Sequence, residues 1–455
     1  MADLVPRSKK LLVIGTGPVG LGTASVLKEA GIPYEQVDAG HDIGGNWRHG
    51  VYVTAHIVSS KASTAFAGYP MPADYPDFPS AAQMLAYLET FARNKGLNGA
   101  IELDKRVVYA RPNRDESWQV WFAGGEQRHY KGVVVCNGHH WDKRYPKLPG
   151  NFTGTLMHSK DYKQPSDLVG KRVLVIGGGN SGCDLASEAA RVARSCDISL
   201  RSGYWFLPKV LFGRPLADLP MGYLPTWAQR LFLRAMIRII IGKYSDYGLA
   251  QPDHRMFERH PTYGTEMLGY IRQGRITPRP GIANCEGETV TFVDGSKGEY
   301  DLIVAATGFH NRVTFLPDGL VPTENNAMHV FGGAFPARVK NLYIIGAFQP
   351  RNGFGSLLIP AMELHARIIK MQDELFHPVG YILRWSGDDT PVDQLVDHYK
   401  KLREIKRSHY LLPVLRWYDW WLSKKHPREV LPPEMYRDPE PAQATPPALA
   451  AADRR

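Results

Sequence analysis

The chain has 455 residues, of which 44% are hydrophobic and 22% are charged, and its 55 lysines and arginines exceed its 45 acidic residues to give a formal net charge of +10. A chain of this size and composition can bury a core large enough to fold without disulfides or structural metal ions. The positive charge is compatible with nucleic acid, a membrane surface or an anionic cofactor, and its even spread along the sequence favours none of them.

The four cysteines are far apart and form no Cys-x-x-Cys pair. This spacing argues against a zinc site and a dithiol redox centre, so we expect no metal, and it fits a reducing, cytoplasmic environment. The charged N-terminus runs directly into an apolar segment, so we expect no signal peptide. The longest apolar run, 231–241, is interrupted by Arg234 and Arg238. It is shorter than the roughly 18 residues of a membrane-spanning helix, so we expect no transmembrane segment.

The first predicted elements are a buried strand at 10–14, a helix at 19–30 and a strand at 34–38. The loop between the first strand and the helix has the pattern G-x-G-x-x-G and contains Gly15, Gly17, Pro18 and Gly20. Glycines at this spacing permit a tight turn and let a pyrophosphate reach the N–H groups of a helix N-terminus. Asp38 follows at the offset of about twenty residues where a carboxylate binds a ribose. This unit therefore predicts a dinucleotide site.

Between this unit and the next, the pattern predicts a helix at 81–95, a hairpin at 118–130 and a buried strand at 133–136. The strand–loop–helix–strand unit then returns, with strands at 172–176 and 198–201 around a helix at 181–193. Its loop contains Gly177, Gly179, Asn180, Ser181 and Gly182.

The second unit ends its second strand without an acidic residue. Arg201 and Ser202 stand there instead. A guanidinium and a hydroxyl suit a 2′-phosphate, so we expect the second nucleotide to be NADPH rather than NADH. The alternative is that Arg201 is a solvated surface residue.

Two such units predict an α/β fold of two doubly wound, Rossmann-like dinucleotide-binding domains. The strands expected at 302–305 and 342–345 lack a nucleotide loop of their own, so we expect the chain to return to a discontinuous first domain. We expect the FAD-binding domain to consist of 1–155 and 305–438, the second part including C-terminal helices. The NADPH-binding domain is expected at 156–304, with a helical insertion at about 204–261. Residues 439–455, rich in Pro and Ala, are expected to be a disordered tail.

Two dinucleotide sites in one chain suggest a flavin that is reduced by a nicotinamide nucleotide. Disulfide reductases share this plan but need a cysteine pair, which leaves flavin oxidases and monooxygenases. The segment 152–163 distinguishes these classes. It fits F-x-G-x-x-x-H-x-x-x-Y-K at every defined position, with Phe152, Gly154, His158, Tyr162 and Lys163. This pattern resembles the fingerprint of the flavin-containing monooxygenase family, the class B flavoprotein monooxygenases. The alternative is a linker whose His158 and Tyr162 only pack.

The resemblance covers 11–367 and implies further cofactor contacts. The segment 42–47 resembles the family's flavin loop, and 306–309 resembles the Ala-Thr-Gly turn by which the chain re-enters the flavin domain. These motifs add Gly45, Asn46, Trp47, Thr307 and Gly308 to the predicted cofactor site. Gln349 belongs to a stretch that resembles the family segment before the helix, expected at 360–367, that points at the flavin ring.

One position departs from the family pattern. Many members carry an Asn before a Ser-Ser-Lys turn, where this chain has Val58. If 52–58 is a strand, His56 and Val58 share a face, and His56 could reach the same region. A lone His is more often a packing residue. The departure resembles a bacterial, type II branch of the family with Baeyer–Villiger activity.

The resemblance implies an NADPH-dependent flavin monooxygenase of the EC 1.14.13 type with FAD and NADPH as cofactors. It would form a C4a-(hydro)peroxyflavin and insert one oxygen atom from dioxygen into a small organic substrate, by sulfide or amine oxygenation or by Baeyer–Villiger oxidation of a ketone. His56 and Gln349 are the catalytic candidates, because both lie near the expected flavin ring.

Three other functions remain open on this evidence. They are an NADPH oxidase that releases hydrogen peroxide, a non-catalytic flavin-binding redox sensor, and an electrostatic membrane or nucleic-acid binder. The expected partners are a small-molecule substrate and dioxygen. We expect no nucleic acid, peripheral membrane contact is the weaker interpretation of the aromatic segment 417–421, and a homodimer is the default assembly.

Overall fold

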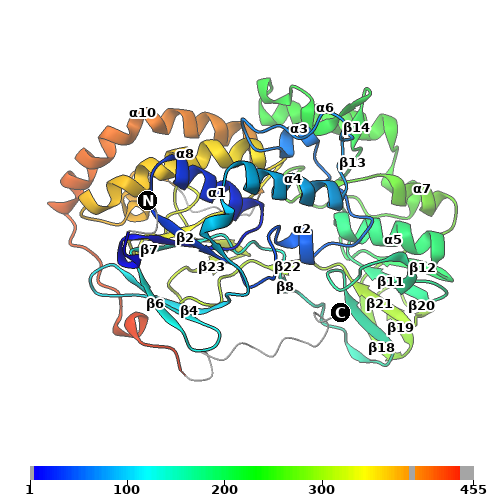
Figure 1. The fold of residues 1–455 in the computed structure, drawn as a ribbon. Coiled ribbons are helices and arrows are strands. Elements are labelled where there is room, and N and C mark those ends of the chain that lie inside the picture. The colour runs from blue at the N-terminus through cyan, green and yellow to red at the C-terminus, as the bar shows by residue number, and fades with distance from the viewer. Residues whose placement is uncertain (1–4, 389–394, 441–455) are drawn as a thin grey trace.

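The structure is a computed structural model that describes residues 5–388 and 395–440. Apart from residues 439 and 440, the predicted disordered tail lies outside the described residues. Figure 1 shows two groups of elements, one built from the N-terminal and C-terminal parts of the chain and the other from its middle. Each group contains one parallel sheet of five strands, so the chain is an α/β protein with parallel sheets, as the sequence predicts.

The first sheet has the strand order β25-β7-β1-β2-β3, and all its neighbours are parallel. Its strands are β1 (Leu11–Ile14), β2 (Tyr34–Val37), β3 (Ile101–Glu102), β7 (Gly132–Val135) and β25 (Leu342–Ile344). Because β25 pairs with β7, a segment about two hundred residues downstream completes this sheet. The helices grouped with it are α1 (Pro18–Glu29), α4 (Ala81–Asn94), α8 (Gly355–Met371), α9 (Val379–Trp385) and α10 (His398–Ser423).

The second sheet has the order β10-β21-β11-β12-β17 and is also parallel throughout. Its strands are β10 (Thr155–His158), β11 (Arg172–Ile176), β12 (Ser195–Ser199), β17 (Thr277–Arg279) and β21 (Leu302–Ala305). The helices beside it are α5 (Asn180–Val192) and α7 (Glu266–Arg272). The segment 204–261 holds the helix α6 (Thr226–Ile240) and the short strands β13 (Phe206–Leu207), β14 (Val210–Leu211) and β15 (Arg214–Pro215), so it is only partly helical.

Two smaller antiparallel groups extend from the sheets. The predicted hairpin is present as β5 (Trp118–Phe122) and β6 (Gln127–Tyr130), with β4 (Val107–Pro112) added at its edge. The second group joins β18 (Ile282–Gly287), β19 (Thr289–Phe292) and β20 (Lys297–Glu299), with β9 (Gly150–Phe152) in parallel beside β18.

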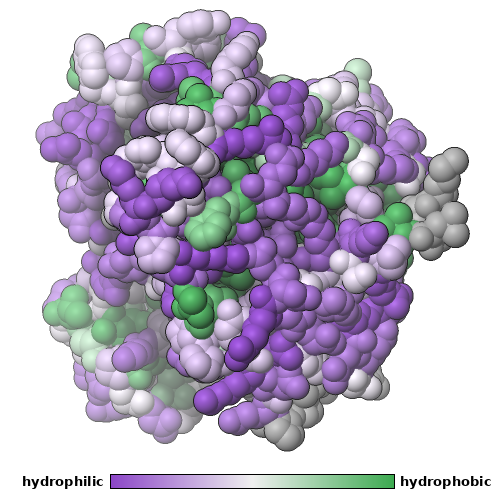
Figure 2. Space-filling model, turned by 90° about the vertical axis from the view of Figure 1, so that its left-hand side faces the viewer, coloured by the Kyte–Doolittle hydropathy of each residue, from purple (hydrophilic) through white to green (hydrophobic). Residues whose placement is uncertain are grey.

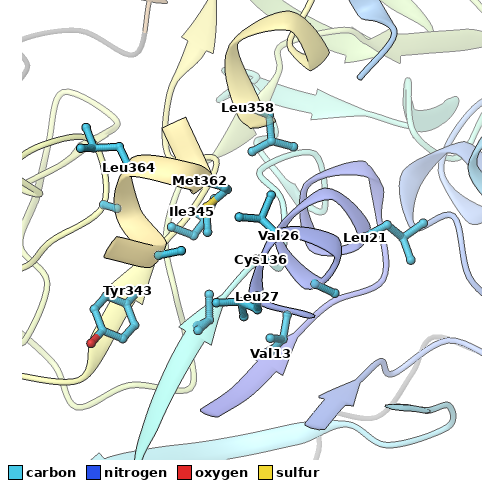
Figure 3. Packing of buried hydrophobic residues seen from close by; sticks show 14 of the residues in the cluster. Val13, Leu21, Val26, Leu27, Cys136, Tyr343, Ile345, Leu358, Met362 and Leu364 are labelled. Atoms are coloured by element: carbon cyan, nitrogen blue, oxygen red, sulfur yellow. The ribbon is translucent and has the colours of Figure 1, made fainter. Parts of the chain in front are cut away.

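The core beside the first sheet places α8 against α1. Val26 of α1 lies next to Met362 and Leu358 of α8 (Figure 3). A Cβ atom added at Gly22 would lie 2.7 Å from Leu358 Cδ2, so this glycine allows the two helices to approach closely. This packing fixes α8 against α1.

Three sequence expectations differ from the structure. Residues 52–58 are not a strand, and only His56 forms an isolated bridge, to Ser80. The helix expected at 360–367 begins earlier, at Gly355, so Pro360 lies inside α8. The second strand of the second unit ends at Ser199, which leaves Arg201 beyond the sheet.

Within the described part of the chain, no helix is both long and apolar enough to cross a membrane.

Candidate active site

The first glycine loop brings α1 very close to β1. Gly15 has φ 112°, and a Cβ atom there would lie 2.4 Å from the Cys136 carbonyl oxygen. A Cβ atom at Gly20 would lie 2.0 Å from the Gly15 oxygen. No side chain caps the N-terminus of α1, and Pro18 occupies its first turn. The free N–H groups and the helix dipole therefore make this end a site for an anion such as pyrophosphate.

Asp38 ties the end of β2 to this loop. Its Oδ2 accepts hydrogen bonds from the Thr16 N–H at 2.6 Å and the Thr16 hydroxyl at 2.7 Å, and its Oδ1 accepts from the Gly40 N–H at 2.8 Å. Gly45, with φ 55°, approaches the same loop, because a Cβ atom on it would lie 2.8 Å from Gly17 Cα. Two backbone segments thus form one wall of a site.

The second glycine loop repeats this geometry. Gly177 also has φ 112°, and its Cβ atom would lie 2.5 Å from the Ala306 oxygen. A Cβ atom at Gly182 would lie 2.0 Å from the Gly177 oxygen. This is the same distance as that between a Cβ atom at Gly20 and the Gly15 oxygen in the first loop. The N-terminus of α5 has no side-chain cap either. The chain therefore presents two open helix N-termini of the same design.

Both loops open onto one cavity of about 2000 Å³. The predicted site residues that line it are Gly15, Gly17, Pro18, Asp38, Gly45, Asn46, Trp47, His56, Gly179, Asn180, Ser181, Gly308 and Gln349. The remaining predicted residues lie behind or beside its walls. Gly20, Gly177 and Gly182 shape the loops from within, and Thr307 makes hydrogen bonds to Arg144.

Arg201 and Ser202 are not brought to the cavity wall. Arg201 is exposed, and Ser202 is partly buried beside it. An exposed guanidinium outside the cavity can still meet the outer end of a nucleotide, whereas it cannot contact the groups between the two loops.

The fingerprint segment contacts several walls of the cavity. His158 Nε2 donates to the Gly308 oxygen at 3.0 Å, and its Nδ1 accepts from the Lys160 N–H at 3.1 Å, so this ring is neutral with the proton on Nε2. Burial lowers the pKa of His158, which agrees with the neutral ring. Lys163 Nζ donates to the His49 oxygen at 3.1 Å. Tyr162 donates to buried Glu188 of α5.

Glu188 is a site-supporting residue that the sequence did not reveal. Besides Tyr162 it accepts a hydrogen bond from Thr54, and one turn away Asp184 accepts from Tyr52 at 2.9 Å. Tyr52 and Thr54 belong to the segment that was expected to be a strand. Their side chains instead bind this segment to α5.

His139 and His140 were also missed as site residues. They follow β7, at the carboxyl end of a parallel strand, which is the position that could have identified them. Gln349 donates to His139 Nε2 at 2.6 Å, and His139 also makes a hydrogen bond to the Gly346 backbone. Burial lowers the pKa of His139 to about 4 and that of His140 well below its usual value, so both rings are neutral near pH 7.

His56 lies on the cavity wall without being part of this histidine cluster. Its Nε2 is 2.6 Å from Lys209 Nζ, in the segment between β13 and β14, and its Nδ1 is 3.4 Å from the Thr54 oxygen. Val58 also lines the cavity. The two residues therefore reach the same space from a turn rather than from one face of a strand.

Residues 8–372 match the protein family described as flavin-binding monooxygenase-like. The chain belongs to this family. Flavin-containing monooxygenase 3 of Rattus norvegicus is 28% identical over 92% of this chain and 86% of its own length. A flavin-containing monooxygenase from Stenotrophomonas maltophilia has a TM-score of 0.60 at 23% identity, over 81% of this chain and 98% of its own. The structure of OTEMO in complex with FAD and NADP has a TM-score of 0.66 at 18% identity, over 81% of this chain and 86% of its own.

Membership in the flavin-binding monooxygenase-like family confirms the predicted class. The chain is an NADPH-dependent flavin monooxygenase, with FAD and NADP(H) as its cofactors. The geometry fits two such groups, because two uncapped helix N-termini face one cavity and a Cβ atom at Gly179 would meet no protein atom within 4 Å. In the described residues, no group of three or more His, Cys, Asp or Glu side chains could hold a metal ion.

Proposed function

We propose that FAD binds the loop 15–20 with Asp38 and the 42–47 loop, and that NADPH binds the loop 177–182 with its 2′-phosphate toward Arg201 and Ser202. On this assignment, 1–155 and 305–438 form the flavin domain and 156–304 forms the NADPH domain. The observation that carries the proposal is the common cavity, because both glycine loops line it. A nicotinamide and a flavin held on these loops would meet in one space.

Bound together, the two cofactors supply the electrons and the dioxygen chemistry by which one oxygen atom enters an organic substrate. The protein holds the cofactors and excludes water from the reaction. His139 contributes by orienting Gln349, because His139 Nε2 accepts a hydrogen bond from the Gln349 amide at 2.6 Å. The Gln349 carbonyl oxygen is then the group left to contact a ligand. His56, held beside Lys209, is the second candidate to contact the substrate or the nicotinamide.

The type of oxygenation that we propose depends on the cavity wall at Val58. An apolar side chain lines the cavity there, where many members of the family carry an amide. The replacement removes an amide NH2 group, with its two N–H donors, and a carbonyl acceptor from the reaction space. We therefore include ketone oxidation of the Baeyer–Villiger type beside oxygenation of sulfides and amines as the proposed activity.

The test compares product formed with NADPH consumed. The FAD-loaded protein is supplied with NADPH, oxygen and in turn methyl phenyl sulfide, N,N-dimethylaniline and cyclohexanone, and hydrogen peroxide is measured in parallel. We expect about one sulfoxide, N-oxide or lactone per NADPH with at least one probe, and the probe that couples identifies the subtype. If one hydrogen peroxide per NADPH is released with all three probes, and also with longer-chain ketones, the result would contradict the proposal and indicate an oxidase.

A further inference from the structure

The cavity continues well beyond the two glycine loops, along one side of α8. Its lining includes Phe354, Leu357, Ala361, Leu364 and Ile368. Residues three or four positions apart lie on one face of a helix, so these side chains form a continuous stripe. At 1.5 Å per residue, the stripe extends for about 21 Å. Phe354, at the first end of the stripe, follows Gln349 closely in the sequence. Ile368, at the other end, is the farthest from Gln349.

The opposite wall is one face of α10. Its apolar lining residues include Ile405, Leu412 and Leu415, and the charged side chains of Lys401, Glu404 and Arg407 also line the cavity there. The two helices run side by side in Figure 1 and are in contact. Leu383 and Trp385 of α9 contribute further apolar surface at the distant end. We call this part of the cavity the α8–α10 channel.

The channel differs from a sealed packing gap in two ways. First, its wall contains His365, which is 6% exposed and donates from Nε2 to the Gly332 oxygen at 3.1 Å. Its Nδ1 has no hydrogen-bond partner among the described residues, and a buried unpaired acceptor is unfavourable in a closed core. Second, Leu412, Leu415 and Tyr418 on the α10 wall pack against the core and still remain partly exposed. Figure 2 views the side on which α10 lies and shows apolar patches between hydrophilic ones.

We propose that the α8–α10 channel binds the alkyl chain of the substrate, so that the substrate is a long, unbranched aliphatic molecule. Its oxidisable sulfur, nitrogen or carbonyl would stand at the end that enters the nucleotide cavity. The proposal rests on the function proposed above, since it assigns the substrate of the same site. The apolar stripe of α8, about 21 Å long, matches an extended chain, and an aromatic or compact substrate would leave most of this length unused.

Binding is measured first, without turnover. The probes are butan-2-one, hexan-2-one, octan-2-one and decan-2-one, titrated calorimetrically into the FAD-loaded protein in the absence of NADPH. Each additional buried methylene is expected to tighten binding about fourfold until the channel is filled. Affinity that does not change from butan-2-one to decan-2-one would overturn the proposal.

Two variants locate the chain. Leu415→Trp and Ala361→Trp place a large ring in the channel from opposite walls, and each is expected to abolish the gain in affinity beyond the short ketones. Tyr410→Trp is the control, because Tyr410 is 85% exposed on α10 and does not line the cavity. If a Trp variant does not fold, as judged by thermal melting, Leu412→Phe narrows the channel more gently. Gains in affinity that persist in every folded channel variant would contradict the assignment.

The two proposals fail separately. A protein that binds decan-2-one tightly through the channel but only releases peroxide with NADPH refutes the oxygenation and keeps the channel. A protein that oxygenates methyl phenyl sulfide with no chain-length preference in binding refutes the channel and keeps the oxygenation.

Discussion

The second glycine loop offers a test in which two neighbouring glycines should respond in opposite ways. A Cβ atom at Gly182 would lie 2.0 Å from the Gly177 oxygen and 2.9 Å from the Gly177 carbonyl carbon. A Cβ atom at Gly179 would meet nothing within 4 Å, and the φ of −72° and ψ of 177° at this position suit alanine. Gly182→Ala therefore disturbs the protein itself, whereas Gly179→Ala adds a methyl group only to the space where we place the pyrophosphate.

The expected magnitudes follow from these contacts. Relief of the overlap in Gly182→Ala requires a backbone shift, so we expect a loss of about 3 kcal/mol or more in the free energy of unfolding. For Gly179→Ala we expect about 1 kcal/mol or less, because alanine is only a weaker N-cap residue than glycine. Its methyl group should instead weaken the charge-assisted hydrogen bonds between the α5 N-terminus and the pyrophosphate. These are worth about 1.5–3 kcal/mol, a roughly tenfold to hundredfold rise in Kd for NADP.

The assay combines urea unfolding with calorimetric titration of NADP into the FAD-loaded protein. Gly179→Ala should unfold almost like the wild type and bind NADP far more weakly, while its FAD content stays unchanged. Unchanged NADP affinity in a folded Gly179→Ala protein would refute the placement of the pyrophosphate at the N-terminus of α5.

Three further predictions test single residues. Arg201→Ala should raise the KM for NADPH about tenfold and leave the KM for NADH unchanged. Equal effects on the two KM values would refute the proposed contact between Arg201 and the 2′-phosphate. Glu188→Ala leaves the Tyr162 and Thr54 hydroxyls without their shared acceptor and should cost about 3 kcal/mol in urea unfolding, with a smaller loss in Thr54→Val. Burial lowers the pKa of His365 to about 4. As the pH drops, the unfolded state therefore binds this proton before the folded state does. The free energy of unfolding should then fall between about pH 6.5 and about pH 4, by up to about 1.4 kcal/mol per pH unit. His365→Leu should flatten that slope in unfolding measured against pH, and an unchanged slope would assign it to other groups.

The nucleotide units could be predicted from the sequence because their signals are local. The strand, the glycine loop and the helix are consecutive, and their spacing is set by backbone sterics rather than by distant contacts. Predicted and observed bounds agree within two residues for β1 and α1 and are identical for β11. The strand before Arg201 ended early because its length depends on its neighbour, and β17 pairs with β12 only as far as Ser199.

The errors occur where distant segments decide the local structure. Residues 52–58 were expected to form a strand, but among the described residues only His56 forms a bridge, to Ser80. Tyr52 and Thr54 make side-chain hydrogen bonds to α5 instead. The start of α8 was missed because a Cβ atom at Gly355 would lie 2.2 Å from the Thr64 oxygen, a close approach between segments that the sequence does not reveal. Pro360, where the helix was expected to begin, lies inside it.

The contacts of the fingerprint segment explain why it identifies the family while containing no evident catalytic group. His158 bonds Gly308 at the re-entry turn, Tyr162 bonds Glu188 of the second unit, and Lys163 bonds His49 beside the flavin loop. Each of these three side chains therefore fixes a different wall of the same cavity. A catalytic role would require the polar atoms to point at a ligand, whereas these are already bonded to the protein. The segment thus connects the two nucleotide units, and the residues proposed to face the substrate lie elsewhere on the cavity wall, with Gln349 first among them.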